Sequence, residues 1–236
     1  MQALAVCLCL LIGLGGLATS KPPLPVSQSV TPEAQALIAP ILEAIAAEQR
    51  RQALLPPPKD DRERIIRLGL LDQVGRQMEA QLDLSELPEG ARALAYATLA
   101  REMQAVDRAN QAALLAMVPP EGWFYRSRYG AEASDAAFLI VQHANPELWR
   151  RFAPVLEPLA QSGEIHGAMY ALMYDRLALA EGRPQRYGSQ MVCLEGRFVV
   201  APLEDREGVD DRRAVLGIGP LAHYEAQFAQ RPPCSG

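Results

Sequence analysis

Two polar side chains, Gln142 and His143, interrupt the apolar stretch FLIVQHANP at 138–146. On a helical wheel the residues around them cover the other directions, so no side of the predicted helix is polar. A helix that is apolar on all sides is buried, and buried amide and imidazole groups cost free energy unless they find partners. Imidazole is also the side chain that most often serves as a general base. We therefore predict His143 as a catalytic base and Gln142 as a residue that positions a substrate.

A carboxylate is predicted in an equally apolar setting at Asp175, within the segment MYDR. The wheel places it among small and aliphatic residues between Ala168 and Leu179, where an ionised Asp needs a cation or several donors. An Asp–His pair fixes the imidazole tautomer, so we predict that Asp175 faces His143 and orients it as the second catalytic residue. Arg176 projects about a quarter-turn away and is predicted to bind the substrate as an anion clamp.

The segment LLDQVGR holds Asp72 and Arg76 at i, i+4, a spacing that allows an ordinary ion pair within one helix. Gly69 and Gly75 lie on the same face, and each costs about 1 kcal/mol relative to Ala in a helix interior. Glycines at such positions indicate the close approach of another element or of a ligand. Asp72 and Arg76 are therefore candidate substrate-binding residues, Arg76 as a second possible anion clamp, with the intrahelical ion pair as the alternative.

The loop RPQRYGSQ, residues 183–190, adds the neutral donors and acceptors of Gln185, Tyr187, Ser189 and Gln190. Such groups are typical of sites that orient a polar substrate. Gln185, Tyr187 and Gln190 are therefore candidate substrate-binding residues, and Ser189 is a weak nucleophile candidate. The alternative is a loop that only caps the ends of helices.

Known metal, serine-nucleophile and nucleotide signatures are absent, since the sequence contains no H-E-x-x-H, no G-x-S-x-G and no phosphate-binding loop. His143, Asp175 and Asp72 are ligand types that Zn²⁺ accepts, but no spacing signature supports a metal site. We expect neither a metal nor another cofactor. His166 and His223 are expected to be packing or surface residues.

Periodic apolar residues predict that helices position most of these groups. Thr31 is predicted to cap the first helix, with Pro32 at its first position, and the prolines at 56–58 end it. The third helix carries a further polar pair, Asp107 and Asn110, at i, i+3. The predicted helices cover residues 32–55, 60–81, 89–118, 135–144, 147–163 and 166–182, with one more starting at 210 or 211 and another at 219–228.

Two predicted strands, SQMVCL and RFVVAPL, flank Glu195 and Gly196 as a hairpin. Ser134 is predicted to cap the helix at 135–144. The fold class is therefore mainly α (α+β), a helical domain with a C-terminal β-hairpin. We expect a signal peptide at 1–20, a Pro-rich linker and N-terminal helix at 21–59, and a single helical domain at 60–236.

The first twenty residues carry no charged side chain and hold an apolar run from Leu4 to Leu17, with Ala18 and Ser20 before Lys21. This pattern is typical of a secretory signal peptide, and the run is too short for a spanning helix. We expect a periplasmic or secreted protein with no membrane span after removal of the signal. The formal net charge of −5 and the lack of a basic cluster disfavour nucleic acid as a partner.

Beyond the signal segment the chain keeps two cysteines, Cys193 and Cys234. In an oxidising compartment they predict one disulfide that ties the C-terminal tail to the strand region. Two free thiols are the alternative.

Five short motifs follow one another along the chain: DQVGR at 72–76, GWF at 122–124, VQHA at 141–144, YDR at 174–176 and QRYGSQ at 185–190. Together they resemble an uncharacterised bacterial family, domain of unknown function 6624, over residues 60–228. Two positions depart from the usual family pattern. Phe124 stands where the family has proline, and Asn145 stands where it often has Asp, which makes Asn145 a poor catalytic candidate. The resemblance implies no reaction.

Two functions remain open. In the first, a polar pocket between the helix at 135–144, the helix at 166–182 and the loop at 183–190 binds or hydrolyses a small polar substrate, with His143 as general base. In the second, the same residues form a satisfied buried network in a non-catalytic structural or interaction module, whose N-terminal helix binds another exported protein. The sequence does not decide between an enzyme and a binding module.

Overall fold

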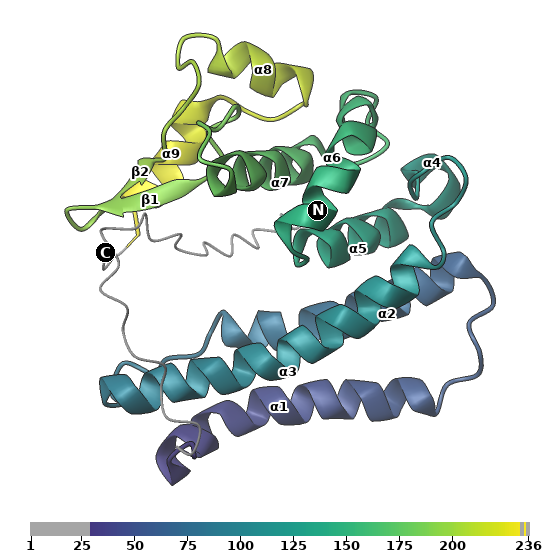
Figure 1. Ribbon diagram of the computed structural model, residues 1–236, viewed down its shortest axis with the longest axis vertical. Coiled ribbons are helices and arrows are strands. Elements are labelled where there is room, and N and C mark those ends of the chain that lie inside the picture. The colour runs from purple at the N-terminus through teal and green to yellow at the C-terminus, as the bar shows by residue number, and fades with distance from the viewer. Residues whose placement is uncertain (1–28, 232–233, 235–236) are drawn as a thin grey trace. The chain divides into compact units, whose positions relative to one another are not determined.

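The computed structural model describes residues 29–231 and Cys234 of the 236-residue chain (Figure 1). The predicted signal peptide at 1–20 lies outside the described residues. The chain divides into two compact units, and the division falls between Ala144 and Asn145. We call them the N-terminal unit and the C-terminal unit. The predicted boundary at residue 60 instead falls within the N-terminal unit, and the predicted single domain at 60–236 spans parts of both.

The described residues form nine helices and one two-stranded antiparallel sheet, which confirms the mainly α fold class with a C-terminal hairpin. None of the described helices is both long and apolar enough to cross a membrane. The elements in chain order are α1 (Pro32–Ala53), α2 (Asp61–Glu79), α3 (Glu89–Leu115), α4 (Arg126–Tyr129), α5 (Ala131–Gln142), α6 (Pro146–Gln161), α7 (Gly167–Ala180), β1 (Met191–Leu194), β2 (Arg197–Val200), α8 (Val209–Val215) and α9 (Leu221–Ala229).

Side-chain caps determine where α1 and α2 begin. Thr31 accepts a hydrogen bond from the backbone N–H of Ala34 at 3.3 Å, and Asp60 accepts one from Glu63 at 2.8 Å. These bonds satisfy backbone donors that a helix start leaves without partners. Both starts agree with the sequence prediction, and the prolines at 56–58 separate the two helices.

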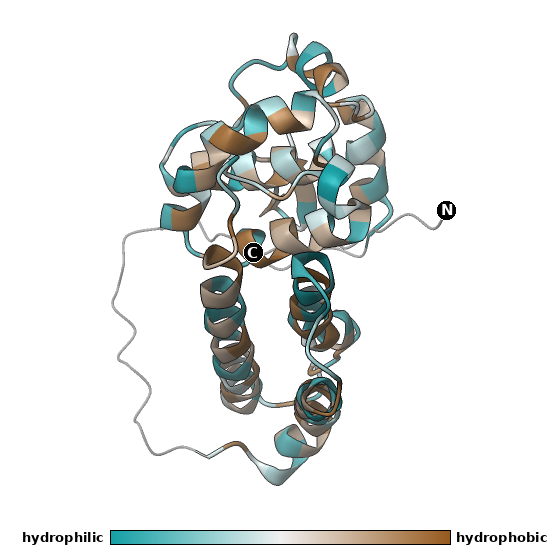
Figure 2. Ribbon diagram, turned by 90° about the vertical axis from the view of Figure 1, so that its right-hand side faces the viewer, coloured by the Kyte–Doolittle hydropathy of each residue, from teal (hydrophilic) through white to brown (hydrophobic). Residues whose placement is uncertain are grey.

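An apolar core holds α1, α2 and α3 together in the N-terminal unit, where the three helices contact one another. Figure 2 shows that hydrophobic and hydrophilic residues alternate along these helices, as one buried face requires. The N-terminal helix is therefore part of this unit and not an extension of it. The buried residues of this core are Ala34, Ile38, Ile41, Ile45, Leu84, Ala95, Leu99, Met103 and Val106.

The two glycines of α2 mark the positions where other helices come closest. A Cβ atom on Gly69 would lie 2.5 Å from the Cβ of Ala136 in α5, and one on Gly75 would lie 2.8 Å from the Cδ1 of Ile45 in α1. Real side chains do not approach so closely, so glycine permits this packing. Of the two explanations that the sequence left open, close approach of another element accounts for both glycines.

Helix α5 begins earlier than predicted. Its start follows Gly130, whose φ of 80° separates α5 from the short helix α4. Glycine adopts positive φ readily, so the chain turns there and a new helix begins at once. Ser134, predicted as the cap, is instead buried inside the helix. The helix ends at Gln142, and His143 is its C-cap residue.

The C-terminal unit contains α6 to α9 and the hairpin. Strand β1 pairs with β2 in a register that sets Met191 opposite Val200, around a turn at Glu195 and Gly196. Both turn residues have positive φ, 50° and 78°, as tight hairpin turns require. Helix α9 packs on β2, where the rings of Phe198 and Phe228 lie 5.6 Å apart.

The predicted disulfide between Cys193 and Cys234 is present. Their Cα atoms lie 5.8 Å apart, and the bridge joins β1 to the end of the chain. The backbone N–H of Cys234 also donates to the carbonyl of Gly196 at 3.2 Å. The tail is therefore held to the hairpin at two points.

Candidate functional site

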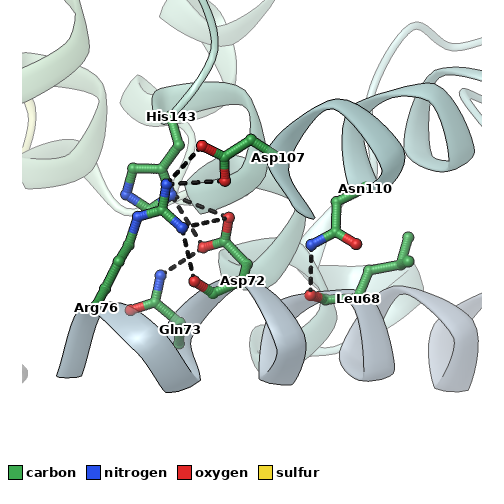
Figure 3. A network of polar contacts seen from close by, with 7 residues as sticks. All are labelled: Leu68, Asp72, Gln73, Arg76, Asp107, Asn110 and His143. Carbon is green, nitrogen blue, oxygen red and sulfur yellow. Dashed lines mark hydrogen bonds and ion pairs between the residues drawn. The ribbon is translucent and has the colours of Figure 1, made fainter. Parts of the chain in front are cut away.

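The imidazole of His143 lies against the carboxylate of Asp72 in the N-terminal unit (Figure 3). Its Nδ1 is 2.9 Å from Oδ2 and 3.1 Å from Oδ1 of Asp72. The Asp72 side chain is fully buried, whereas the His143 side chain keeps 10% of its surface exposed. The carboxylate that contacts His143 is thus supplied by Asp72, and not by Asp175 as the sequence predicted.

Several donors besides His143 surround the Asp72 carboxylate. Gln73 donates from Nε2 to Oδ2 at 2.6 Å, and Arg76 approaches Oδ1 from Nη1 at 3.4 Å. Burial acts to raise the pKa of Asp72, but the hydrogen bond from His143 and the charges of His143 and Arg76 outweigh it, so the pKa lies below its ordinary value. Asp72 is therefore ionised at neutral pH.

Arg76 connects Asp72 to a second carboxylate, that of Asp107 in α3 (Figure 3). Its Nη2 lies 2.8 Å from each Asp107 oxygen, and its Nη1 donates to the main-chain carbonyl of Asp72 at 2.7 Å. The predicted pair at i, i+4 therefore exists, but the shorter side-chain contacts of Arg76 cross to another helix. Burial raises the pKa of Asp107, a change that the charge of Arg76 only partly offsets.

Asp107 is a member of this cluster that the sequence analysis did not place at the site. The feature of the sequence that could have identified Asp107 is its spacing from Asn110, the other polar residue on the buried side of α3. Asn110 donates from Nδ2 to the carbonyl of Leu68 in α2 at 3.1 Å. Both residues thus fix α3 against α2, one through an ion pair and the other through a hydrogen bond.

The second ring nitrogen of His143, Nε2, has no hydrogen-bond partner among the residues that the structure describes. Its hydrogen-bonding capacity is therefore not used within the described chain. Gln142, predicted to position a substrate, is the last residue of α5 and is buried. Among the described residues of this unit that were predicted to bind a substrate, Asp72 and Arg76 join the imidazole cluster.

Asp175 in the C-terminal unit is fully buried, and backbone donors surround it. Its Oδ1 accepts from the N–H groups of Arg186 at 2.7 Å and Tyr187 at 3.0 Å, and its Oδ2 accepts from Ser189 at 2.9 Å. Burial raises the pKa of Asp175, although these donors act in the opposite direction. The sequence required a cation or several donors here, and the loop at 183–190 supplies the donors.

The polar side chains of this loop are engaged within the C-terminal unit. Gln185 donates to the carbonyls of Gln190 and Ala201, at 3.0 and 2.9 Å, and accepts from the N–H of Gln190 at 2.9 Å. Ser189 donates from Oγ to the carbonyl of Ala171 at 3.2 Å, and Gln190 donates from Nε2 to that of Leu172 at 3.2 Å. The bonds of Ser189 and Gln190 fasten the loop to α7, and those of Gln185 join the two ends of the loop and the residue after β2.

Two further predicted residues, Tyr187 and Arg176, are buried in aromatic surroundings. Burial raises the pKa of Tyr187 to about 12, so its hydroxyl stays protonated at neutral pH. The guanidinium of Arg176 lies 5.8 Å from the ring centre of Trp149. Arg213, which the sequence analysis did not single out, is also buried and donates to the carbonyl of Tyr187 at 2.8 Å.

Within the described ranges, no group of three or more His, Cys, Asp or Glu residues is arranged to hold a metal ion.

The cluster in the N-terminal unit contains two carboxylates and one guanidinium. A protonated imidazole at His143 balances this charge, whereas a neutral imidazole leaves one negative charge in excess. A neutral imidazole is therefore surrounded by a net negative charge.

Comparison with known proteins identifies one family. The family described as "Family of unknown function (DUF6624)" matches residues 80–230, nearly two thirds of the chain. The match includes His143, Asp107 and the loop around Asp175, whereas Asp72 and Arg76 precede it. No curated protein and no solved structure matches the chain.

Proposed function

The chain belongs to the DUF6624 family, and we propose that His143, oriented by Asp72, acts in it as a general base on a small polar substrate. The observation that carries this proposal is the 2.9 Å contact of Nδ1 with a buried carboxylate, on a ring whose other nitrogen has no partner in the described chain. Carboxylate and imidazole in this arrangement are typical of sites that move protons.

The ionisation of Asp72 determines the tautomer of His143. An ionised carboxylate only accepts hydrogen bonds, so Nδ1 must carry the hydrogen. In the neutral ring the lone pair is then on Nε2. In a hydrolysis, Nε2 takes a proton from a water molecule while the water oxygen attacks the electrophilic carbon, and the protonated ring returns the proton to the leaving group.

The charges of the cluster favour an uncharged substrate. Arg76 directs one guanidinium nitrogen to Asp107 and the other to Asp72, which leaves it poorly placed as the predicted anion clamp. A negatively charged group near Nε2 would also meet the excess negative charge of the two carboxylates. Neutral esters and amides are therefore the substrate classes that fit best.

Export is part of the same proposal. The Cys193–Cys234 disulfide is typical of an oxidising compartment, and the apolar N-terminal segment has the pattern of a signal peptide. Both features support a periplasmic or secreted protein.

A structural role is the second candidate for the polar residues of the C-terminal unit. The Asp175 carboxylate and the side chains of Gln185 and Ser189 bond to the protein backbone, as a satisfied buried network requires. In the N-terminal unit, a groove of about 450 Å³ between α1 and α3 would then be a surface for a partner. Leu42, Ile45 and Val106 contribute its apolar lining.

The test is turnover of a panel of uncharged nitrophenyl esters and nitroanilides by the full chain. His143→Gln and Asp72→Asn are each expected to lower kcat/KM by about 100-fold or more, the usual contribution of a general base. His223→Gln is the matched control, because His223 is exposed on α9 and is expected to leave turnover unchanged. Turnover that survives in His143→Gln at the wild-type rate refutes the proposal, and no turnover by the wild type favours the structural role.

A further inference from the structure

Two donors compete for one oxygen of Asp72. Its Oδ1 lies 3.1 Å from Nδ1 of His143 and 3.4 Å from Nη1 of Arg76. A guanidinium and a carboxylate prefer to form two parallel hydrogen bonds, which are stronger than a bond to a neutral imidazole. Arg76 could therefore take both oxygens of Asp72, yet it is found in a weaker, single contact.

The position of Asp107 accounts for this. Arg76 places Nη2 at 2.8 Å from both oxygens of Asp107, while its Nη1 donates to the main-chain carbonyl of Asp72 at 2.7 Å. Both short contacts go to groups other than the Asp72 carboxylate (Figure 3). The Asp107 side chain is 11% exposed and the Arg76 side chain 10%, so water competes little for this pair.

We propose that Asp107 is a positioning residue, which holds Arg76 on α3 and thereby leaves the Asp72 carboxylate to His143. The inference deepens the proposed function, because it concerns the same imidazole. Once Asp107 is neutral, Asp72 is the remaining carboxylate in the cluster, and Arg76 turns to it. The Nδ1 hydrogen of His143 then loses its acceptor and is exposed to exchange with water.

The Nδ1 hydrogen itself provides the readout, and no substrate is needed. The whole sequence has three histidines, so the imidazole signals of His143 can be assigned by comparison with His143→Gln in NMR spectra of ¹⁵N-labelled protein. A ring hydrogen held by a carboxylate resonates downfield and exchanges slowly. The variants to compare are Asp107→Asn, Arg76→Gln and the double variant, which together form a double-mutant cycle.

In Asp107→Asn the Nδ1 hydrogen is expected to exchange at least about tenfold faster than in the wild type, the lower end of the factor that corresponds to loss of one charge-assisted hydrogen bond. In Arg76→Gln the competitor is gone, so exchange is expected to be no faster than in the wild type. The double variant should match Arg76→Gln. Glu102→Gln is the control, because it removes one negative charge from an exposed site on the same helix and should change nothing.

Two results overturn the proposal. One is unchanged exchange in Asp107→Asn, and the other is an equal acceleration by Asp107→Asn with and without Arg76, which would mean that the charge of Asp107 acts directly. Circular dichroism melts verify that each variant is folded. If Asp107→Asn does not fold, Arg76→Gln decides, since faster exchange there shows that Arg76 supports the imidazole contact. Hydrolysis by the wild type and His143→Gln tests the function separately, so either idea can fail alone.

Discussion

Replacement of Asp175 by Ala should destabilise the protein strongly, because three backbone donors lose their acceptor at once. The donors are the N–H groups of Arg186, Tyr187 and Ser189, at 2.7 to 3.0 Å from the carboxylate. A buried donor left without a partner costs about 1 to 3 kcal/mol, so three of them cost at least about 3 kcal/mol. For a chain of this size that corresponds to a fall of roughly 6 to 12 °C in the unfolding midpoint.

Thermal and urea unfolding of Asp175→Ala beside the wild type measure this loss. Asp175→Asn should lose less, because its amide keeps one acceptor oxygen. Asp211→Ala is the matched control, an exposed Asp on α8 whose removal should change the unfolding free energy by no more than about 0.5 kcal/mol. Hydrogen exchange should also show that the amides of Arg186 and Ser189 lose protection. A melting point for Asp175→Ala within about 2 °C of the wild type would refute the reasoning.

Three other perturbations have outcomes that the structure determines. Gly69→Ala should destabilise by about 1 to 3 kcal/mol, because its new methyl group would lie 2.5 Å from the Cβ of Ala136, and adding Ala136→Gly should restore most of the loss in urea unfolding. Cys193→Ser should lower the unfolding free energy by at most about 4 kcal/mol, the chain-entropy value for a bridge across 41 residues, and reduction of the wild type should give the same change in melting temperature. The lowered pKa of Asp72 means that its ionised form stabilises the fold above the unfolded-state pKa and that this contribution is lost as pH falls through the folded-state pKa. The difference in unfolding free energy between wild type and Asp72→Asn should therefore shrink from about pH 5 to about pH 2, measured by urea unfolding at each pH, and a difference that grows in this range would contradict the assignment.

The elements that the sequence predicted well are those that neighbouring residues determine. Thr31 and Asp60 cap their helices through bonds that span three residues, and Glu195 and Gly196 form the hairpin turn between adjacent strands. Such interactions join residues that lie within a few positions of each other in the sequence. The predicted start of α5 was wrong, because Ser134 was predicted as the cap, whereas the turn at Gly130 begins the helix at Ala131.

The candidate site was predicted in its residue types but not in its pairing. A helical wheel gives the direction of a side chain and the polarity of its face, so His143 and Asp175 were recognised as polar groups in apolar surroundings, and Asp72 by its spacing from Arg76 beside two glycines. It does not give the partner that lies in that direction. The sequence analysis paired Asp175 with His143, whereas packing in three dimensions assigned Asp72 to the imidazole and Asp175 to a set of backbone amides.

The contacts of the two buried carboxylates also differ in the length of chain that they close. Asp175 reaches amides 11 to 14 residues away, whereas Asp72 meets His143 across 71 residues. By the logarithmic dependence of closure entropy on length, the longer contact costs about 1.5 kcal/mol more to form. The loop around Asp175 can therefore order early, while the imidazole finds its acceptor only after α2, α3 and α5 have assembled. An unfolded chain thus carries no oriented base until its N-terminal unit has finished folding.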